Sequence, residues 1–245
     1  PFDAPFFWWH HGEANQDPKA AAGVLYYGGW AVTSGDLAGK VTGEIPRSFV
    51  QAEFRNFEGE AYSVYTTRHL HVAIIAKRER WDRERNRSHL QVLAYAALMD
   101  SDRQLHPWMP VVLTAKSLSA WYLTDSIRRW PSLTAKTRRE KFDGVTPWAF
   151  YLTLGTFGKD RVQVEVGKRQ KNFITPCQLY QPDNLDEALS KRLVDPDTFR
   201  QMGELKAAAS DWLNAWSSEQ ERPSRKAEPN YYDGYERDEK EEVPF

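Results

Sequence analysis

The sequence contains a single cysteine, Cys177, among its 245 residues. One thiol can form neither an internal disulfide nor a zinc site with several thiolate ligands, and it suits a reducing, intracellular setting. The sequence also lacks an apolar run of about 18 residues, which excludes a membrane-spanning helix. It lacks the cationic start of a signal peptide as well. We therefore expect a protein of the cytoplasm.

Motifs of the common enzyme classes are missing too. The sequence has no P-loop, no dinucleotide-binding glycine pattern, no His-Glu-x-x-His zinc motif and no Gly-x-Ser-x-Gly nucleophile motif. His69 and His71 share one face of an expected strand, but no carboxylate or thiol beside them completes a set of metal ligands. We therefore expect no catalytic site, no metal and no cofactor. Cys177 is expected to be a small buried residue.

Charge is distributed unevenly, although the net charge is only −1. The first 181 residues carry 24 Lys and Arg against 18 Asp and Glu, whereas the last 27 residues carry 5 against 9. Aromatic residues make up 13% of the chain, enough to fill a core or to stack on flat ligands. A basic body with an acidic end indicates an anionic partner for the body and a different partner for the end.

Periodicity and composition divide the chain into four parts. Alternating apolar residues predict strands in the body, including a long one from Ala61 to Lys77 that Arg68 interrupts. Asp195 followed by Pro196 is typical of a helix start. The fold class is therefore mainly β with C-terminal helices (α+β). The parts are an N-terminal arm (1–22), a β-rich domain (23–182), a helical segment (183–216) and a disordered acidic tail (217–245).

Three local predictions concern the body. The run from Lys77 to Arg87 is almost wholly charged and predicts an exposed loop or projecting hairpin. A helix that begins after Ser117 is expected to end before Pro131, with a basic loop over 132–147. The turn Gly158-Lys159-Asp160 is expected to join the strands on its two sides as a β-hairpin.

Basic and aromatic residues alternate along the body in a pattern that suits single-stranded nucleic acid. Cations hold the phosphates of such a strand, and aromatic faces stack on its bases. Phe54, Phe57 and Trp130 could equally belong to the core, and the arginine-rich run could be a solvated loop that pairs with its own carboxylates. Trp121, Trp148 and Phe150 are assigned to packing. The predicted nucleic-acid-binding residues are Arg47, Phe54, Arg55, Phe57, Arg68, Lys77, Arg78, Arg80, Trp81, Arg128, Arg129, Trp130, Lys168, Arg169, Lys171 and Phe173.

The C-terminus carries a more specific signal. Asp238, Glu239, Glu241 and Glu242 precede the terminal residues Val243-Pro244-Phe245. The Phe245 ring has nothing to pack on within an acidic tail, so a pocket on a partner could take the ring while a basic rim takes the carboxylates. Pro244 limits the backbone freedom that such binding would cost. The simpler interpretation is a solubilising acidic end that happens to finish in Phe.

This terminus resembles that of bacterial single-stranded DNA-binding proteins, which end in an acidic tip closing in a hydrophobic residue, Pro and Phe. Some phage single-stranded DNA-binding proteins are similar in having an acidic tail with a terminal Phe. The resemblance covers only the last residues of the chain. It implies that the tip docks replication, recombination and repair proteins, and that the body is an enlarged OB-fold-like β-barrel. The larger body and the helical segment favour a phage-type member.

We therefore expect a non-enzymatic protein that coats single-stranded DNA without regard to sequence and recruits partners through residues 238–245. It would act in a bacterial cell or phage-infected host, near the nucleoid, as a monomer or a homo-oligomer. The tail could also cover the basic groove when DNA is absent. Other classes stay open: an RNA-binding or regulatory module, a nuclease or accessory subunit of a nucleic-acid enzyme, and a phage scaffolding protein with a docking tail.

Phe245→Ala tests the docking tip directly. We expect the variant to bind oligo(dT) as the wild type does, because the tip does not hold the strand, and to lose capture of replication proteins from a bacterial lysate. Fluorescence anisotropy measures the first property and affinity pull-down the second. Equal capture by both proteins would contradict a docking role for the ring.

Overall fold

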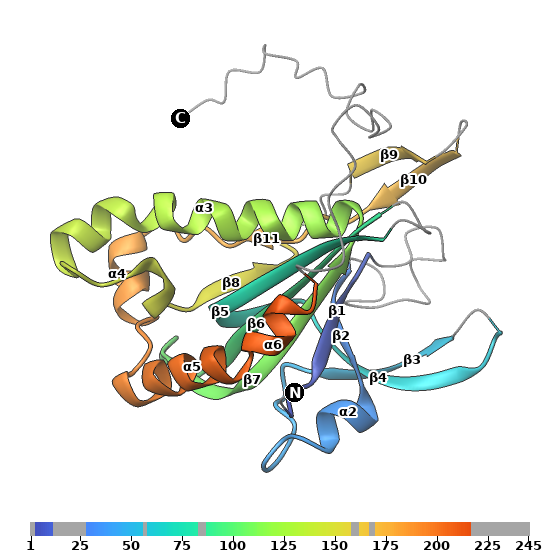
Figure 1. The fold of residues 1–245 in the computed structure, drawn as a ribbon, viewed down its shortest axis with the longest axis horizontal. Helices are drawn as coiled ribbons and strands as arrows, with labels where there is room; N and C mark the ends of the chain where they lie inside the picture. Colours follow the sequence, from blue (N-terminus) through green and yellow to red (C-terminus); the bar gives the residue numbers. More distant parts are fainter. Residues whose placement is uncertain are drawn as a thin grey trace.

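A computed structural model describes residues 3–11, 28–55, 58–82, 87–157, 162–166 and 170–216 (Figure 1). The acidic tail lies outside these ranges. The elements, in chain order, are β1 (Phe6–His10), β2 (Gly29–Thr33), α2 (Ser34–Ala38), β3 (Val50–Arg55), β4 (Ala61–Thr67), β5 (His69–Asp82), β6 (Arg87–Met99), β7 (Leu105–Lys116), α3 (Leu118–Lys141), a 3-10 turn (Pro147–Ala149), β8 (Leu152–Gly155), β9 (Val162–Val166), β10 (Gln170–Ile174), β11 (Gln178–Leu179), α4 (Leu185–Ser190), α5 (Pro196–Ala208) and α6 (Ser210–Asn214).

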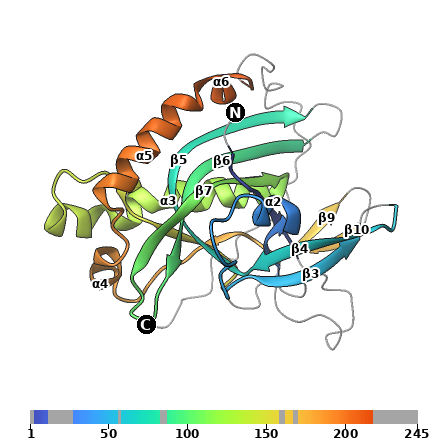
Figure 2. The same cartoon turned by 90° about the horizontal axis from the view of Figure 1, so that it is seen from below.

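Nine of the strands form one sheet in the order β11-β8-β5-β6-β7-β1-β2-β4-β3. Neighbours pair antiparallel except β1 and β7, which are parallel. Strands β4 and β5 lie far apart in this order, yet a single residue, Arg68, joins them in the chain. The sheet must therefore curl until the end of β4 meets the start of β5, which makes it a half-barrel (Figures 1 and 2).

Two irregularities accompany this curl. The β5–β6 register shifts between Ile74 and Ala76, and the β6–β7 register shifts between Ala96 and Ala97. An extra residue on one strand bends it and increases its twist, so both shifts help the long strands β5, β6 and β7 to curve. Figure 2 shows these three strands curving side by side. The part of the charged run from Lys77 to Asp82 pairs with β6, as in the projecting hairpin that the sequence predicts, and the pairing extends to Asp82 and Arg87.

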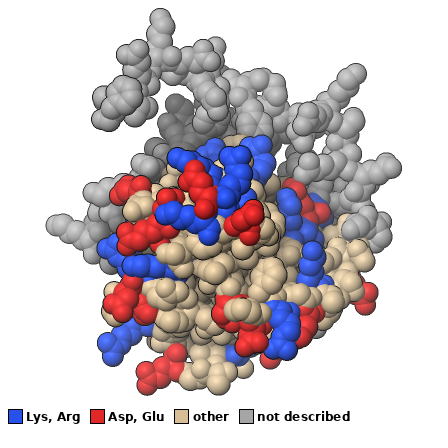
Figure 3. Space-filling view, turned by 90° about the vertical axis from the view of Figure 1, so that its left-hand side faces the viewer, with Lys and Arg blue, Asp and Glu red and all other residues tan. Residues whose placement is uncertain are grey.

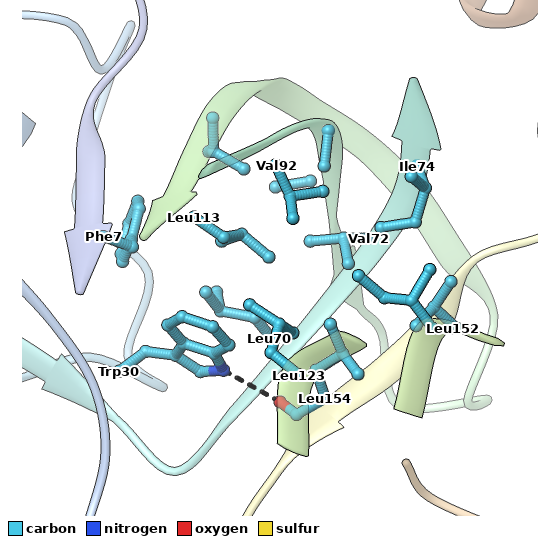
Figure 4. Close-up of a cluster of buried hydrophobic side chains, with 14 of the residues drawn as sticks. Phe7, Trp30, Leu70, Val72, Ile74, Val92, Leu113, Leu123, Leu152 and Leu154 are labelled. Carbon is cyan, nitrogen blue, oxygen red and sulfur yellow. Dashed lines mark hydrogen bonds between the residues drawn. The ribbon is translucent and has the colours of Figure 1, made fainter. Parts of the chain in front are cut away.

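The inner face of the half-barrel holds the main hydrophobic core. Period-two side chains such as Leu70, Val72 and Val92 point into it from β5 and β6 (Figure 4). Trp30 on β2 is fully buried, and its indole Nε1 donates a 3.1 Å hydrogen bond to the carbonyl oxygen of Leu154 on β8. This bond joins strands from distant parts of the sheet order, so it also holds the curl closed.

Helix α3 covers the open side of the half-barrel. Its buried residues include Leu123, Ile127 and Trp130, which join the main core. The predicted helix end before Pro131 is wrong, because the helix continues to Lys141 and includes the expected basic loop. Pro131 lacks the N–H that would bond to the carbonyl of Ile127. Packing on both sides of Pro131 offsets this loss, and the Thr134 hydroxyl bonds to the carbonyl of Trp130 at 2.9 Å.

Helices α5 and α6 pack on the outer face. Met202 and Trp212 are buried against residues of β5, β6 and β7. The predicted start of α5 is confirmed, since Asp195 caps it by accepting a 2.9 Å bond from the Thr198 N–H and Pro196 is its first residue. Helix α4 begins at Leu185, in the place expected for a short helix.

Two topological predictions are wrong. Residues 6–10 were placed in an N-terminal arm, but they form β1, an inner strand between β7 and β2, because the aromatic residues Phe7 and Trp9 are buried in the core. Strand β9 was expected to pair with β8 across the turn at 158–160. It pairs instead with β10 in a separate two-stranded sheet, and β8 pairs with β5 and β11.

The protein is mainly β with a few helices, as the sequence predicts. The enlarged OB-fold-like barrel is not confirmed, since the main sheet is a nine-stranded half-barrel. Across the described ranges, no helix is both long and apolar enough to span a bilayer.

Gly155→Ala should destabilise the fold by about 1–3 kcal/mol, the usual cost of overpacking. An added Cβ would lie 2.2 Å from the carbonyl oxygen of Arg68 and 2.7 Å from Cδ2 of His69, where β8 meets the β4–β5 junction. Urea unfolding measures the change. Gly203→Ala is the control: its Cβ meets no atom within 4 Å, and alanine inside α5 should stabilise by about 0.5–1 kcal/mol. Equal effects would contradict the close approach at the junction.

Candidate nucleic-acid interface

An open groove of about 830 Å³ lies at the β4–β5 junction. The segment from Pro46 to Ala52 forms one wall, and the end of β4, Arg68 and the start of β5 form another. The end of the β6–β7 hairpin completes it with Ala97, Leu98, Met99 and Trp108. The one-residue link at Arg68 therefore brings strands β3 and β4, at one edge of the sheet, next to the end of the β6–β7 hairpin.

The charges in this groove have one sign. Among the described residues, its lining contains Arg47 and Arg68 and neither Asp nor Glu. Arg47 is exposed, whereas Arg68 is half-buried and directs its Nε toward the Thr156 hydroxyl at 3.4 Å. Both arginines were predicted from the sequence as nucleic-acid-binding residues, and the fold places them in one groove. Two guanidinium groups in one lining suit an anionic ligand.

Aromatic rings lie in and beside the groove. Trp108 is half-buried against Phe49, with ring centroids 5.4 Å apart, and lines the groove. His69 stacks on Phe157 at 4.7 Å with the two planes 7° apart, and Phe157 contacts Tyr180 at 5.3 Å. Tyr180 is 40% exposed. The rings of His69, Phe157 and Tyr180 lead from the groove to the edge of the sheet. A base could stack on an exposed face of these rings.

The two histidines of the groove are neutral at pH 7. Burial, with Arg192 and His69 nearby, lowers the pKa of His71 to about 3. Burial also lowers the pKa of His69. The hydrogen bond to the Thr156 carbonyl raises this pKa in part, and the nearby charge of Arg68 lowers it further. The positive charge facing a ligand at neutral pH therefore comes from arginine.

Two predicted stacking residues are wrong because the fold buries their rings. Phe54 is 8% exposed and packs with Trp8, His10 and Tyr62. Trp130 is 1% exposed, and its indole donates a 2.8 Å bond to the carbonyl of Pro147. Neither ring can receive a base, since the core takes both faces.

Several predicted cations lie away from the groove. Arg55 bonds to the carbonyl of Gly59 at 3.0 Å and approaches Glu53 at 3.6 Å. Arg128 and Arg129, exposed on α3, both pair with Asp125, at 2.8 and 2.7 Å. Where α3 ends, Lys and Arg are interspersed with Asp and Glu, so this face does not have a single sign of charge (Figure 3).

The charged part of the β5–β6 hairpin, called the basic hairpin below, contacts the end of the helical segment. The Arg78 guanidinium lies between the rings of Trp212, 3.8 Å away, and Trp216, 4.1 Å away, and it also bonds to Gln91 and to the carbonyl of Trp212. Arg80 lies 4.7 Å from the Trp216 ring. Lys77 is exposed. Arg78, predicted as a nucleic-acid ligand, is therefore occupied by a clamp of two indole rings.

The remaining predicted residues are not described. Phe57, Lys168 and Arg169 and the docking residues Asp238, Glu239, Glu241, Glu242, Val243, Pro244 and Phe245 lie outside the described ranges. Trp81 lies on β5, and Lys171 and Phe173 lie on β10, but their side chains are outside the description.

Sequence reasoning missed the rings of Trp108, Phe157 and Tyr180. Trp108 lies between Pro107 and Pro110 in β7, a polar and proline-rich surrounding that could have marked it as partly exposed. Phe157 and Tyr180 carry no such signal, since they meet only through strand pairing. Trp121, assigned to packing, is 45% exposed, so that prediction is wrong.

Nothing described here resembles a metal or thiol site. Across the described ranges, no three His, Cys, Asp or Glu side chains are grouped closely enough to hold a metal. Cys177 is buried as predicted, and burial raises the pKa of its thiol well above the ordinary value. Its thiolate is therefore scarce at neutral pH.

The free energy of unfolding should fall as the pH is lowered from 6.5 to 4.5. Burial lowers the pKa of His10 to about 4 and that of His71 to about 3, so the unfolded chain binds more protons in this range. Each group contributes up to about 1.4 kcal/mol per pH unit. Urea unfolding at several pH values measures the slope, which should be shallower in His71→Gln. An unchanged slope in that variant would contradict the neutral His71.

Comparison with known proteins leaves the groove as the basis for assigning a function. A scan against protein-family models, a search of curated proteins and a search of solved structures found no match to this chain. The groove's two arginines and the neighbouring rings are therefore the features from which a function can be inferred.

Proposed function

We propose that this protein binds single-stranded DNA in the groove at the β4–β5 junction. The observation that carries the proposal is the lining itself, in which the fold brings Arg47 and Arg68 together beside the Trp108 ring. Phosphates of a bound strand would lie against the two guanidinium groups. Because phosphate contacts carry no base information, this binding would be largely independent of sequence.

The neighbouring rings supply the second part of strand binding. A volume of about 830 Å³ is of the size that holds a small-molecule ligand, here one or two nucleotides. Trp108 offers a ring within the groove, and the exposed side chains Val50 and Met99 add apolar surface. A base that stacks on such a surface gains about 1–3 kcal/mol. Only unpaired bases present their faces in this way, which favours a single strand over a duplex.

The half-barrel would then serve as the strand-binding body in place of an OB barrel, and the acidic tip would recruit replication, recombination and repair proteins. Support for the tip comes from the terminal sequence Val243-Pro244-Phe245 behind four carboxylates. Trp216, the last described residue, contacts Arg78, Arg80 and His89 on the hairpin. The tail would therefore start beside the basic hairpin, in a protein acting in the cytoplasm of a bacterial cell or phage-infected host.

The double variant Arg47→Gln/Arg68→Gln tests the groove. We expect oligo(dT) affinity to fall at least about tenfold at low salt. The slope of log K against log salt should decrease in magnitude by about 1.4, since each lost phosphate contact on a single strand accounts for about 0.7. Fluorescence anisotropy at several salt concentrations measures both quantities.

Arg200→Gln/Lys206→Gln is the matched control, because it removes two cations from the exposed side of α5. Wild-type binding by the groove variant, or equal loss in the control, would contradict the proposal. Tighter binding of a matched oligo(U) would favour the RNA-binding alternative. Metal-dependent cleavage of the bound strand would favour a nuclease.

A further inference from the structure

A buried positive charge lies behind the groove without a counter-ion. Arg192 is 7% exposed. Its Nη1 donates to the Thr153 hydroxyl at 2.7 Å and to the carbonyl of Tyr151 at 3.3 Å, and its guanidinium lies 5.9 Å from the Tyr180 ring. Within the described ranges no carboxylate pairs with Arg192, and its Nε and Nη2 make no hydrogen bond. A buried cation normally needs an anion to offset the free energy of desolvation.

Thr153 links this charge to the groove. Its hydroxyl lies 2.7 Å from Nδ1 of His71, and His71 lines the groove. A guanidinium can only donate, so the hydroxyl accepts from Arg192. Among the described residues, Nδ1 of His71 is the one acceptor within reach of the hydroxyl proton, so the hydroxyl is satisfied as both donor and acceptor when it donates to Nδ1. A neutral imidazole that accepts at Nδ1 carries its proton on Nε2. His71 therefore presents Nε2–H, which has no hydrogen-bond partner in the described part of the chain.

The neighbouring histidine has a different hydrogen-bonding arrangement. Nε2 of His69 lies 2.9 Å from the carbonyl oxygen of Thr156, which can only accept. The His69 proton is therefore on Nε2 and is already used, so its remaining nitrogen accepts. Of the two groove histidines, only His71 can donate to a ligand oxygen.

We propose that the groove floor binds a phosphate oxyanion, with His71 Nε2–H as the neutral donor and Arg192 as the buried charge that the anion balances. Arg192 and Thr153 are positioning residues: they hold His71 in the donating tautomer and do not touch the ligand. The other charged or titratable groups around this pair are Arg68 and His69 in the groove and Tyr180 beside Arg192, and Arg68 adds positive charge at the same wall. This inference deepens the proposed function and rests on it only for the source of the phosphate, a strand backbone or free phosphate.

Thr153→Val tests the relay, because valine keeps the shape and removes the hydroxyl. Histidine ring nitrogen spectra of ¹⁵N-labelled full-length protein report the tautomer of His71. We expect the Nε2–H form in the wild type and a mixture of tautomers in the variant. Affinity for inorganic phosphate and for an oligo(dT) of about eight nucleotides should each fall about twofold for an even mixture, in proportion to the lost Nε2–H form. The fall should be about tenfold in His71→Phe, which loses the whole hydrogen bond to the charged ligand.

Thr134→Val is the matched control, since it also removes a hydroxyl hydrogen bond from a buried threonine, on α3. It should leave the His71 spectrum and both affinities unchanged. His71→Phe and Arg192→Met should also weaken binding of both probes. Urea unfolding confirms that each variant is folded. If Thr153→Val does not fold, His71→Phe alone decides the outcome, because it removes the donor itself.

The outcomes separate the two proposals. Wild-type affinity for both probes in His71→Phe would overturn the phosphate site, while loss of oligo(dT) binding in Arg47→Gln/Arg68→Gln would still support the strand groove. Binding of inorganic phosphate that depends on His71, without binding of oligo(dT), would support the site with free phosphate as its ligand and would remove the proposed function. A wild-type His71 spectrum showing the Nδ1–H form would overturn the relay.

Discussion

The single-residue link between β4 and β5 is the constraint on which the rest of the structure depends. Four strands separate β4 from β5 in the sheet, so one residue can join them only if the sheet curls back on itself. Curling creates an inner face, which the aromatic and aliphatic residues fill, and the bond from Trp30 to Leu154 joins the two sides. It also places Arg68 where the end of β4 meets the end of the β6–β7 hairpin, and the groove opens at this point.

The chemistry of the groove follows from how burial treats each type of side chain. Burial keeps the histidines neutral, because their pKa values are low enough for the proton to be lost at pH 7. Arginine keeps its charge even when buried. Arg192 therefore remains a cation behind neutral rings, while Arg47 and Arg68 face the opening. The groove therefore combines one exposed guanidinium, one half-buried guanidinium and one buried guanidinium with neutral imidazoles.

The basic hairpin shows a different use of the same residue types. A run of Arg and Lys beside Trp resembles a strand-binding surface in sequence, and such a run can also bind part of its own chain. Here Arg78 lies between Trp212 and Trp216, more than 130 residues further along the chain. The hairpin thereby anchors the end of the helical segment. Sequence alone does not distinguish the two uses, because a guanidinium stacks on an indole ring as readily as on a base.

The sequence by itself determined the features that depend on neighbouring residues: the strands of the long hairpin, the break at Arg68, the Asp195 cap and the acidic terminus. It identified Arg47 and Arg68 by charge but could not place them in one groove. Only the tertiary structure decided which aromatic residues are buried, since Trp130 and Phe54 differ from Trp108 and Tyr180 in their neighbours across the sheet and not in local sequence. The tertiary structure also decided that Arg192 lies close to His71. The pairing of β5 with β8 places Thr153 next to His71, and the Thr153 hydroxyl bonds to both residues.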